Sequence, residues 1–234
     1  MFDPAVNSYA HRGLWDATRP ENSLAAFHAA VVAGVGIELD VRLSADGVAM
    51  VFHDQMLDRM TNASGWMHAR TAHELVKLKL PGGEPLPRLR DALTLIGDAA
   101  PILIELKADA GSPDALVEAV AEDLKHHSGA AAIMSFTDEA LAAAIDAEID
   151  CPIGLLIAPQ SDRTQDVLED RISIAKSLGC DFLGPHYSLI TALDTQMPMV
   201  SWTIDTPAAL DALSPAGHRV AAPIFERVAP CALR

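Results

Sequence analysis

The sequence has few cysteines, few aromatic residues and no long apolar run, and each shortage excludes a class of protein. Only 3 of its 234 residues are cysteines, at positions 151, 180 and 231. This odd, widely spaced set predicts neither a disulfide framework nor a zinc site, and it favours a reducing cytoplasm. No apolar stretch approaches the roughly 18–20 residues of a membrane span. The N-terminus, MFDPAVNSYA, has neither a basic start nor an apolar stretch, so we expect no secretory signal.

Basic side chains are also scarce, since 17 Lys and Arg stand against 32 Asp and Glu, for a net charge of −15. Such a balance argues against nucleic-acid binding, which needs a basic face, and against stable association with an anionic membrane. An anionic substrate would need a local basic pocket or a metal to oppose the overall field. The acidity is otherwise typical of a cytoplasmic protein surface.

Short apolar runs alternate with amphipathic segments along the whole chain. Helices are expected after the capping residues Ser23, Thr71, Ser112, Thr137 and Thr206. The expected strands are Ser8–His11, Gly36–Val41, Val48–His53, Ile102–Lys107, Ala131–Phe136, Ile153–Ile157, Phe182–His186 and Met199–Ile204, with a weaker ninth run at 218–222. This alternation predicts a mostly parallel sheet. Eight such units predict a (β/α)₈ barrel, as a single domain over residues 1–234.

One connection does not fit a regular barrel. Only residues 42–47 separate the second and third runs, which is too short for a helical crossover between parallel neighbours. The Asp46–Gly47 pair predicts a hairpin turn instead. Either the barrel is irregular here or one of the nine runs lies outside it.

Three acidic residues are placed where a barrel would gather them. Glu38 and Asp40 are two apart on an expected strand, so both carboxylates face the same side. Glu105 ends another strand, and parallel strand ends converge at the face that carries active sites. Three carboxylates there would repel one another without a cation, and oxygen ligands favour Mg²⁺ or Ca²⁺ over zinc. Lys107, on the same side as Glu105, is a candidate to bind a phosphate oxygen, and its other expected role, a salt bridge with Glu105, does not exclude this one.

Two histidines also end apolar runs. His11 ends the first and is followed by Arg12, and His53 ends the third. Cleavage of a phosphodiester needs charge neutralisation, a base for the nucleophile and an acid for the leaving oxygen. Imidazole serves either proton-transfer role near neutral pH, and the planar fork of arginine suits a phosphate. His186, at the end of the seventh strand, is a further candidate for the pocket, whereas the other histidines are expected to be structural or exposed.

The motifs AHRG (10–13), PENS (20–23), ELDV (38–41), ADG (45–47), FHDQMLDRMT (52–61), IELK (104–107) and SWTID (201–205) occur together. In this order and spacing the chain resembles the glycerophosphodiester phosphodiesterase family. The resemblance implies an irregular (β/α)₈ (TIM) barrel and one divalent cation. It assigns acid–base roles to His11 and His53, metal ligation to Glu38, Asp40 and Glu105, and phosphate binding to Arg12 and Lys107. It also implies that Glu21 and Asn22 order the first loop, and that Trp202 lies near the glycerol.

The chain departs from the family pattern in three places. Residues 219–228 read RVAAPIFERV, where the family usually closes with a stretch like ITDRP. Asp205 stands where asparagine is common. The stretch between His53 and Glu105 is short, which predicts an open pocket with a loose choice of alcohol.

The expected activity is hydrolysis of a small glycerophosphodiester to glycerol 3-phosphate and an alcohol, within glycerol and lipid metabolism. The attacking group is either the glycerol 2-hydroxyl or water, and either histidine can be the base. A second hypothesis is action on lysophospholipids or other phosphodiesters, with Trp15, Trp66 and Met67 as candidates for an apolar groove. A third is a non-catalytic phosphoester-binding protein. The sequence leaves the preferred alcohol, the metal and the oligomeric state open.

Overall fold

Eight parallel strands form a nearly closed barrel in a computed structural model that describes residues 2–108, 112–159, 165–214 and 220–226. The strands are β1 (Tyr9–Ala10), β2 (Gly36–Leu43), β4 (Ile102–Leu106), β5 (Ala131–Ser135), β6 (Ile153–Ile157), β7 (Phe182–Pro185), β8 (Val200–Ile204) and β9 (Ala222–Phe225). Their spatial order is β7-β6-β5-β4-β2-β1-β9-β8, and isolated bridges join β7 to the segment around β8. The predicted barrel is therefore confirmed.

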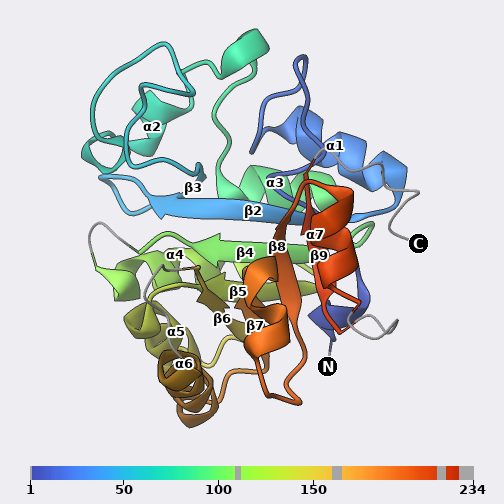
Figure 1. The fold of residues 1–234 in the computed structure, drawn as a ribbon. Helices are drawn as coiled ribbons and strands as arrows, with labels where there is room; N and C mark the ends of the chain where they lie inside the picture. Colours follow the sequence, from blue (N-terminus) through green and yellow to red (C-terminus); the bar gives the residue numbers. More distant parts are fainter. Residues whose placement is uncertain (1, 109–111, 160–164, 215–219, 227–234) are drawn as a thin grey trace.

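Helices cover the outside of the strands, with α4, α5 and α6 along one side and α1 and α3 along another (Figure 1). The α-helices are α1 (Leu24–Ala33), α2 (Ala72–Leu75), α3 (Leu89–Ile96), α4 (Pro113–Leu124), α5 (Asp138–Asp146), α6 (Gln165–Leu178) and α7 (Pro207–Ala212). Short 3₁₀ helices lie at Pro4–Val6, Met67–Ala69, Pro81–Gly83 and Tyr187–Ala192. Among the described residues, no helix is both long enough and apolar enough to cross a membrane.

Three of the five predicted caps form side-chain hydrogen bonds, whereas Ser112 and Thr137 precede their helices without one. Ser23 Oγ accepts the backbone N–H of Ala26 at 3.1 Å, and Thr206 Oγ1 accepts that of Ala209 at 3.2 Å. Thr71 forms a reciprocal capping box with Glu74. Each bond satisfies a backbone donor that the first helical turn leaves without a partner. These caps fix where the chain turns from the site loops into the outer helices.

The doubtful third run lies outside the barrel. It is β3 (Ala49–Val51), which pairs antiparallel with β2 through Val41 and Val51. Gly47 forms the intervening turn with φ of 77°, a conformation that favours glycine. The chain from β3 to residue 88, here called the hairpin segment, has a hydrophobic core of its own: Met50, Phe52, Leu57, Met67, Ala72, Leu75, Leu80 and Leu86. Figure 1 shows this segment, with α2, beside β2 and outside the ring of strands.

The predicted bounds of the ninth strand were wrong. The strand was expected to end at residue 222, and β9 begins there. The described part of the expected run, residues 220–222, enters a strand only at Ala222, and β9 continues to Phe225. Pro223 lies inside this strand, and a proline within an apolar run argues against a strand because it donates no ladder hydrogen bond. β9 pairs with β1 on one side and β8 on the other. It therefore completes the barrel despite the divergent sequence.

Large side chains fill the part of the barrel interior that lies away from the carboxyl ends of the strands. A Cβ atom on Gly154 would meet the ring of Phe182 at 2.3 Å, and one on Gly36 would meet the ring of Tyr9 at 2.5 Å. These glycines make room for rings that belong to the inner cluster, which also contains Met134, Leu156 and Ile224. Because the interior is packed in layers, the open space described below lies on the side of that cluster toward the carboxyl ends of the strands.

Candidate active site

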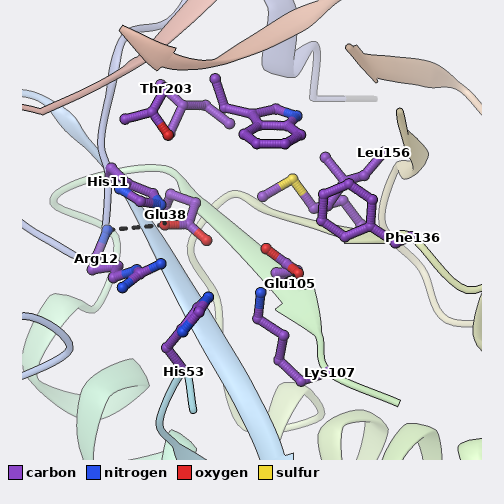
Figure 2. A pocket seen from close by; sticks show the side chains of 12 residues that line it. His11, Arg12, Glu38, His53, Glu105, Lys107, Phe136, Leu156 and Thr203 are labelled. Carbon is purple, nitrogen blue, oxygen red and sulfur yellow. Dashed lines mark hydrogen bonds and ion pairs between the residues drawn. The ribbon is translucent and has the colours of Figure 1, made fainter. Parts of the chain in front are cut away.

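A cavity of about 260 Å³ lies above the inner cluster. Its lining combines charged and apolar side chains from seven of the eight barrel strands or the loops that follow them, and from the hairpin segment (Figure 2). The lining residues are His11, Arg12, Glu38, His53, Glu105, Lys107, Met134, Phe136, Leu156, Trp202, Thr203 and Ile224. The cavity thus gathers most of the residues that the sequence motifs singled out.

Three carboxylates converge at one side of the cavity. Asp40 on β2 and Glu105 on β4 are direct register partners, and Glu38 lies one pleat earlier on β2. One oxygen from each of the three lies within 4.8 Å of the others. All three residues are buried, at 1%, 0% and 7% exposure for Glu38, Asp40 and Glu105. The strand spacing had predicted this convergence.

Two cations face the carboxylates. Lys107 Nζ forms an ion pair with Glu105 and lies 3.1 Å from Asp40 Oδ1, while Arg12 Nε lies 3.3 Å from Asp40 Oδ2. Burial opposes ionisation of Asp40, but the charges of Lys107 and Arg12 outweigh it and hold the pKa of Asp40 well below its usual range. Lys107 therefore forms the salt bridge that was one of its two expected roles, and it also lines the cavity.

The pKa values of Glu38 and Glu105 are shifted in the opposite direction from that of Asp40. Burial, followed by the charges of Asp40 and Glu105, raises the pKa of Glu38 well above its usual range. Burial also raises the pKa of Glu105 to about 7, against the charge of Lys107. Glu38 Oε2 accepts the backbone N–H of Arg12 at 2.9 Å, whereas its Oε1 is buried without a hydrogen-bond partner. A buried, unpaired carboxylate oxygen within an all-oxygen cluster fits a divalent cation.

The two histidines enter the cavity from different sides (Figure 2). His11 follows β1, and its Nε2 lies 3.9 Å from Glu38 Oε2. His53 follows β3, outside the barrel, and the hairpin fixes it because Arg42 Nε donates to the His53 carbonyl at 2.8 Å. Burial lowers the pKa of His53, although the charge of Asp40 opposes that effect. Both rings lie beside the acidic cluster, as their positions in the sequence predicted.

Each imidazole has a carboxylate on its Nδ1 atom. His53 Nδ1 lies 2.7 Å from Asp54 Oδ1, and His11 Nδ1 lies 2.9 Å from Glu226 Oε2. A carboxylate in that position fixes the orientation of the ring and leaves Nε2 for the cavity. Sequence reasoning missed Glu226 because the last strand was expected too early. The only signal for Glu226 in the sequence was an acidic residue directly after the end of a strand.

The residues of the PEN motif hold the first loop against the cluster. Asn22 is buried, and its Nδ2 donates to Asp40 Oδ2 at 2.7 Å. Glu21 accepts from Arg12 at 2.7 Å and from Arg59 at 2.7 and 2.9 Å. Neither Glu21 nor Asn22 lines the cavity, so both act on it through their partners.

Arg59 is a second residue that sequence reasoning left unassigned. Its Nε donates to Asp54 Oδ2 at 2.6 Å, and its other nitrogens reach Glu21. Although Asp54 is partly buried, these bonds lower its pKa to about 2, so it remains an anion beside His53. Arg59 thereby ties the hairpin segment to the loop after β1. Its place in the FHDQMLDRMT motif was the available signal.

The opposite side of the cavity is apolar. Met134, Leu156 and Ile224 form part of the inner cluster, with Phe136 and Trp202 above them. Trp202 Nε1 donates to the Gly184 carbonyl at 2.8 Å, and its ring packs edge-on against Phe136 with centroids 5.4 Å apart.

His186 does not line the cavity, so it has no direct place in the pocket. Its ring packs edge-on against Trp202 with centroids 5.1 Å apart. Its Nδ1 is bonded to the hydroxyl of Ser188 at 2.8 Å. It therefore supports the tryptophan from outside.

Comparison with known proteins gives one consistent match. The model of the glycerophosphoryl diester phosphodiesterase family matches residues 11–220. The glycerophosphodiester phosphodiesterase of Caldanaerobacter subterraneus subsp. tengcongensis is 39% identical over 127 residues, which cover 48% of this chain and 51% of that protein. The enzyme of that name from Bacillus subtilis is 29% identical over 202 residues, covering 76% of this chain and 69% of its own. The chain spans about half the length of the first curated relatives it matches.

Solved structures extend the match to the whole barrel. A phosphodiesterase from Oleispira antarctica, in complex with the product sn-glycerol-3-phosphate, superposes with a TM-score of 0.78 at 26% identity, covering 94% of this chain and 93% of that chain. A structure described as a putative glycerophosphoryl diester phosphodiesterase from Silicibacter pomeroyi gives a TM-score of 0.76 at 25% identity, covering 95% and 91%.

Proposed function

Because the chain belongs to the glycerophosphoryl diester phosphodiesterase family, we propose that it hydrolyses a small glycerophosphodiester to glycerol 3-phosphate and an alcohol. The observation that carries the proposal is the meeting of two histidines, two cations and the carboxylates of Glu38 and Glu105 in one cavity, with Asp40 buried in the same acidic cluster. The related Oleispira antarctica phosphodiesterase, whose structure holds sn-glycerol-3-phosphate, supports the choice of substrate.

Glu38, Asp40 and Glu105 are the proposed ligands of one divalent cation, Mg²⁺ or Ca²⁺. Such a cation, when bound, neutralises phosphate charge and lowers the pKa of a bound hydroxyl group. The unpaired Glu38 Oε1 and the oxygen-only donor set support this assignment. Asn22 keeps Asp40 in place through its side-chain hydrogen bond.

Arg12 and Lys107 are the proposed phosphate-binding residues. Both line the cavity, and both are held by carboxylates: Arg12 by Glu21 and Asp40, Lys107 by Glu105 and Asp40. Because these cations are already oriented, they can stabilise charge that develops on the phosphate without rearrangement of the site. They also offset the net negative charge of the protein where an anionic substrate enters.

His11 and His53 are the proposed proton-transfer pair. One accepts the proton of the attacking group, and the other gives a proton to the leaving alkoxide. The same pair serves attack by the glycerol 2-hydroxyl, through a cyclic phosphate that water opens, and direct attack by water. Each histidine is expected to contribute about 10²–10⁴-fold in rate.

The test is turnover of glycerophosphocholine by His11→Ala and His53→Ala, with saturating Mg²⁺ or Ca²⁺ and detection of glycerol 3-phosphate. We expect kcat to fall by about 10²–10⁴-fold in each variant. Thermal unfolding of each variant serves as the folding control. Near-normal turnover in both variants would remove the acid–base assignment.

A lysophospholipid is the second candidate substrate, and the apolar side of the cavity favours it. Phe136 lines the cavity beside Trp202 and is 37% exposed, whereas Trp66 on the hairpin segment is 48% exposed and does not line the cavity. Met67, in contrast, is buried in the core of the hairpin segment and cannot contribute to an apolar groove. Release of choline from lysophosphatidylcholine, measured beside release from glycerophosphocholine, separates the two candidates. Faster turnover of the lysophospholipid would replace the first proposal.

A further inference from the structure

Glu226 contacts His11 although 215 residues separate them in the sequence. β1 and β9 are parallel neighbours, with Ala10 opposite Phe225, so His11 and Glu226 are the next residues along the two strands. The backbone holds both residues in this register, because the His11 N–H donates to the Phe225 carbonyl and the Glu226 N–H to the Ile204 carbonyl, each at 2.9 Å. The contact is therefore built into the closing strand pair of the barrel.

We propose that Glu226 is a positioning residue that holds the proton of His11 on Nδ1 and directs its Nε2 into the cavity. A carboxylate accepts hydrogen bonds but donates none, so a neutral His11 bonded to it carries its proton on Nδ1. Nε2 then faces the cavity beside Glu38 with a free lone pair. The value of this arrangement to catalysis rests on the proposed role of His11 in the reaction.

The other histidine provides an internal comparison. His53 has the same arrangement, with Asp54 on Nδ1, and Arg59 anchors Asp54. Asp54 is the next residue in the chain after His53, whereas Glu226 reaches His11 only when the last strand is in place. The two pairs therefore leave Nε2 of both imidazoles for the cavity, through unrelated parts of the chain.

The proposed role also assigns a function to one residue of the divergent stretch at 219–228. Glu226 falls in the divergent segment where the family usually closes with a pattern like ITDRP. Its side chain is 20% exposed and that of His11 is 15% exposed, so the contact is largely shielded from water. A shielded, charge-assisted hydrogen bond is stronger than an exposed one.

The first measurement is the tautomer of His11, read from the ¹⁵N chemical shifts of both ring nitrogens at a pH of about 9, above the usual pKa of imidazole. We expect a protonated Nδ1 in the wild-type protein and loss of that preference in Glu226→Ala. The signals of His53, whose Asp54 is untouched, should stay unchanged. A wild-type His11 protonated on Nε2, or a tautomer unaffected by Glu226→Ala, would overturn the proposal. This readout needs no substrate, so it stands even if the proposed activity fails.

The second measurement is steady-state turnover of glycerophosphocholine. Carboxylates that orient a metal-binding imidazole are typically worth about 10–100-fold. We expect Glu226→Ala to lower kcat by about the same factor, while KM changes less than about twofold. Glu226→Gln replaces an acceptor-only carboxylate with an amide whose N–H can donate to Nδ1, so it should not restore the kcat of the wild type. Glu122→Ala, which removes an exposed acid on α4 paired with Lys125, is the matched control and should leave both constants unchanged.

Two outcomes of the kinetic test count against the proposal. A loss of kcat in Glu226→Ala with an unchanged His11 tautomer would assign the loss to another cause. Wild-type kcat in Glu226→Gln, with the proton of His11 on Nε2, would show that the tautomer is not what matters. If Glu226→Ala does not fold, Glu226→Gln decides the matter alone: its His11 signals should show a weaker preference for a protonated Nδ1, and a preference as strong as in the wild type would show that the carboxylate does not set the tautomer.

Discussion

The two halves of the cavity differ in what holds them together. Every charged residue of the lining comes from β1, β2 or β4, from the loops that follow them, or from the hairpin segment. Ion pairs or hydrogen bonds fix these side chains. β5, β6, β8 and β9 supply an almost wholly apolar surface that is fixed by packing, with Trp202 as its main polar anchor. We therefore expect changes in the charged half to lower kcat, and changes in the apolar half to act mainly on KM.

The largest effect is expected from Glu38→Gln in the charged half. It removes a proposed metal ligand, so activity should fall by about 10³-fold or more, the equivalent of several kcal/mol. Without added metal, the variant should be at least as stable as the wild type. The pKa of Glu38 is raised in the folded state, so its ionisation costs stability as pH rises above the unfolded value, and glutamine mimics the neutral form.

Turnover and thermal unfolding, with and without Mg²⁺ or Ca²⁺, test both parts of this expectation. The added cation should raise the melting temperature of the wild type but not that of Glu38→Gln. An equal rise in both proteins would show that Glu38 is not a ligand.

A smaller loss, about 10²–10³-fold in kcat, is expected from Arg12→Lys. Lysine keeps the positive charge but lacks the planar fork that reaches Glu21 and Asp40 together. Steady-state kinetics with glycerophosphocholine measures the loss. Lys125→Arg, an exchange between the same residue types on the exposed face of α4, is the control. Full activity in Arg12→Lys would mean that charge alone suffices at this position.

Metal affinity should depend on pH by up to about tenfold per pH unit for each proton released. Burial raises the pKa of Glu105 to about 7 in the metal-free protein. Below that pH a proton competes with the cation for the carboxylate, so affinity should fall as pH is lowered from about 8 to about 6. Calorimetric titration in two buffers of different ionisation enthalpy counts the released protons. A flat affinity across this range would contradict the expectation. Glu105→Gln should reduce the dependence and leave the part due to Glu38, whose pKa burial also raises.

Substitutions in the apolar half of the cavity should have the smallest effect, and they should change KM more than kcat. Trp202→Ala removes the ring that packs on Phe136, so KM should rise by about tenfold, consistent with roughly 1–1.5 kcal/mol for an aromatic contact. We expect kcat to change less than about threefold, because no charged group of the cavity bonds to Trp202. Trp66→Ala, on the hairpin segment, is the control. A fall in kcat larger than the rise in KM would break the division between the two halves.

The same division explains what the sequence could predict. Acids, histidines and an arginine at strand ends carry a chemical signal, so His11, Glu38 and Glu105 are identifiable from their residue types and spacing. Met134 and Leu156 are the same kind of residue as the rest of the core, and only the closure of the barrel shows that they face a cavity.

Strand boundaries followed a similar rule. Most strands were predictable from apolar runs and caps, and the Asp46–Gly47 turn correctly warned that β3 does not belong to the barrel. β9 was misplaced because Pro223 interrupts its pattern. Glu226 was missed in consequence, since its partner is 215 residues away and no local pattern links the two.

The separate core of the hairpin segment has a consequence for cooperativity. Its buried side chains pack mainly among themselves, so the segment has the features of an independent unit of local opening. Opening of that unit would withdraw His53 and Asp54 while β2 and β4 kept the three acids in place. The protein would then have a folded form with an intact cation site and no second imidazole. Native-state hydrogen exchange would reveal it as amides such as Leu57 and Leu80 exchanging at a lower free energy than those of β4.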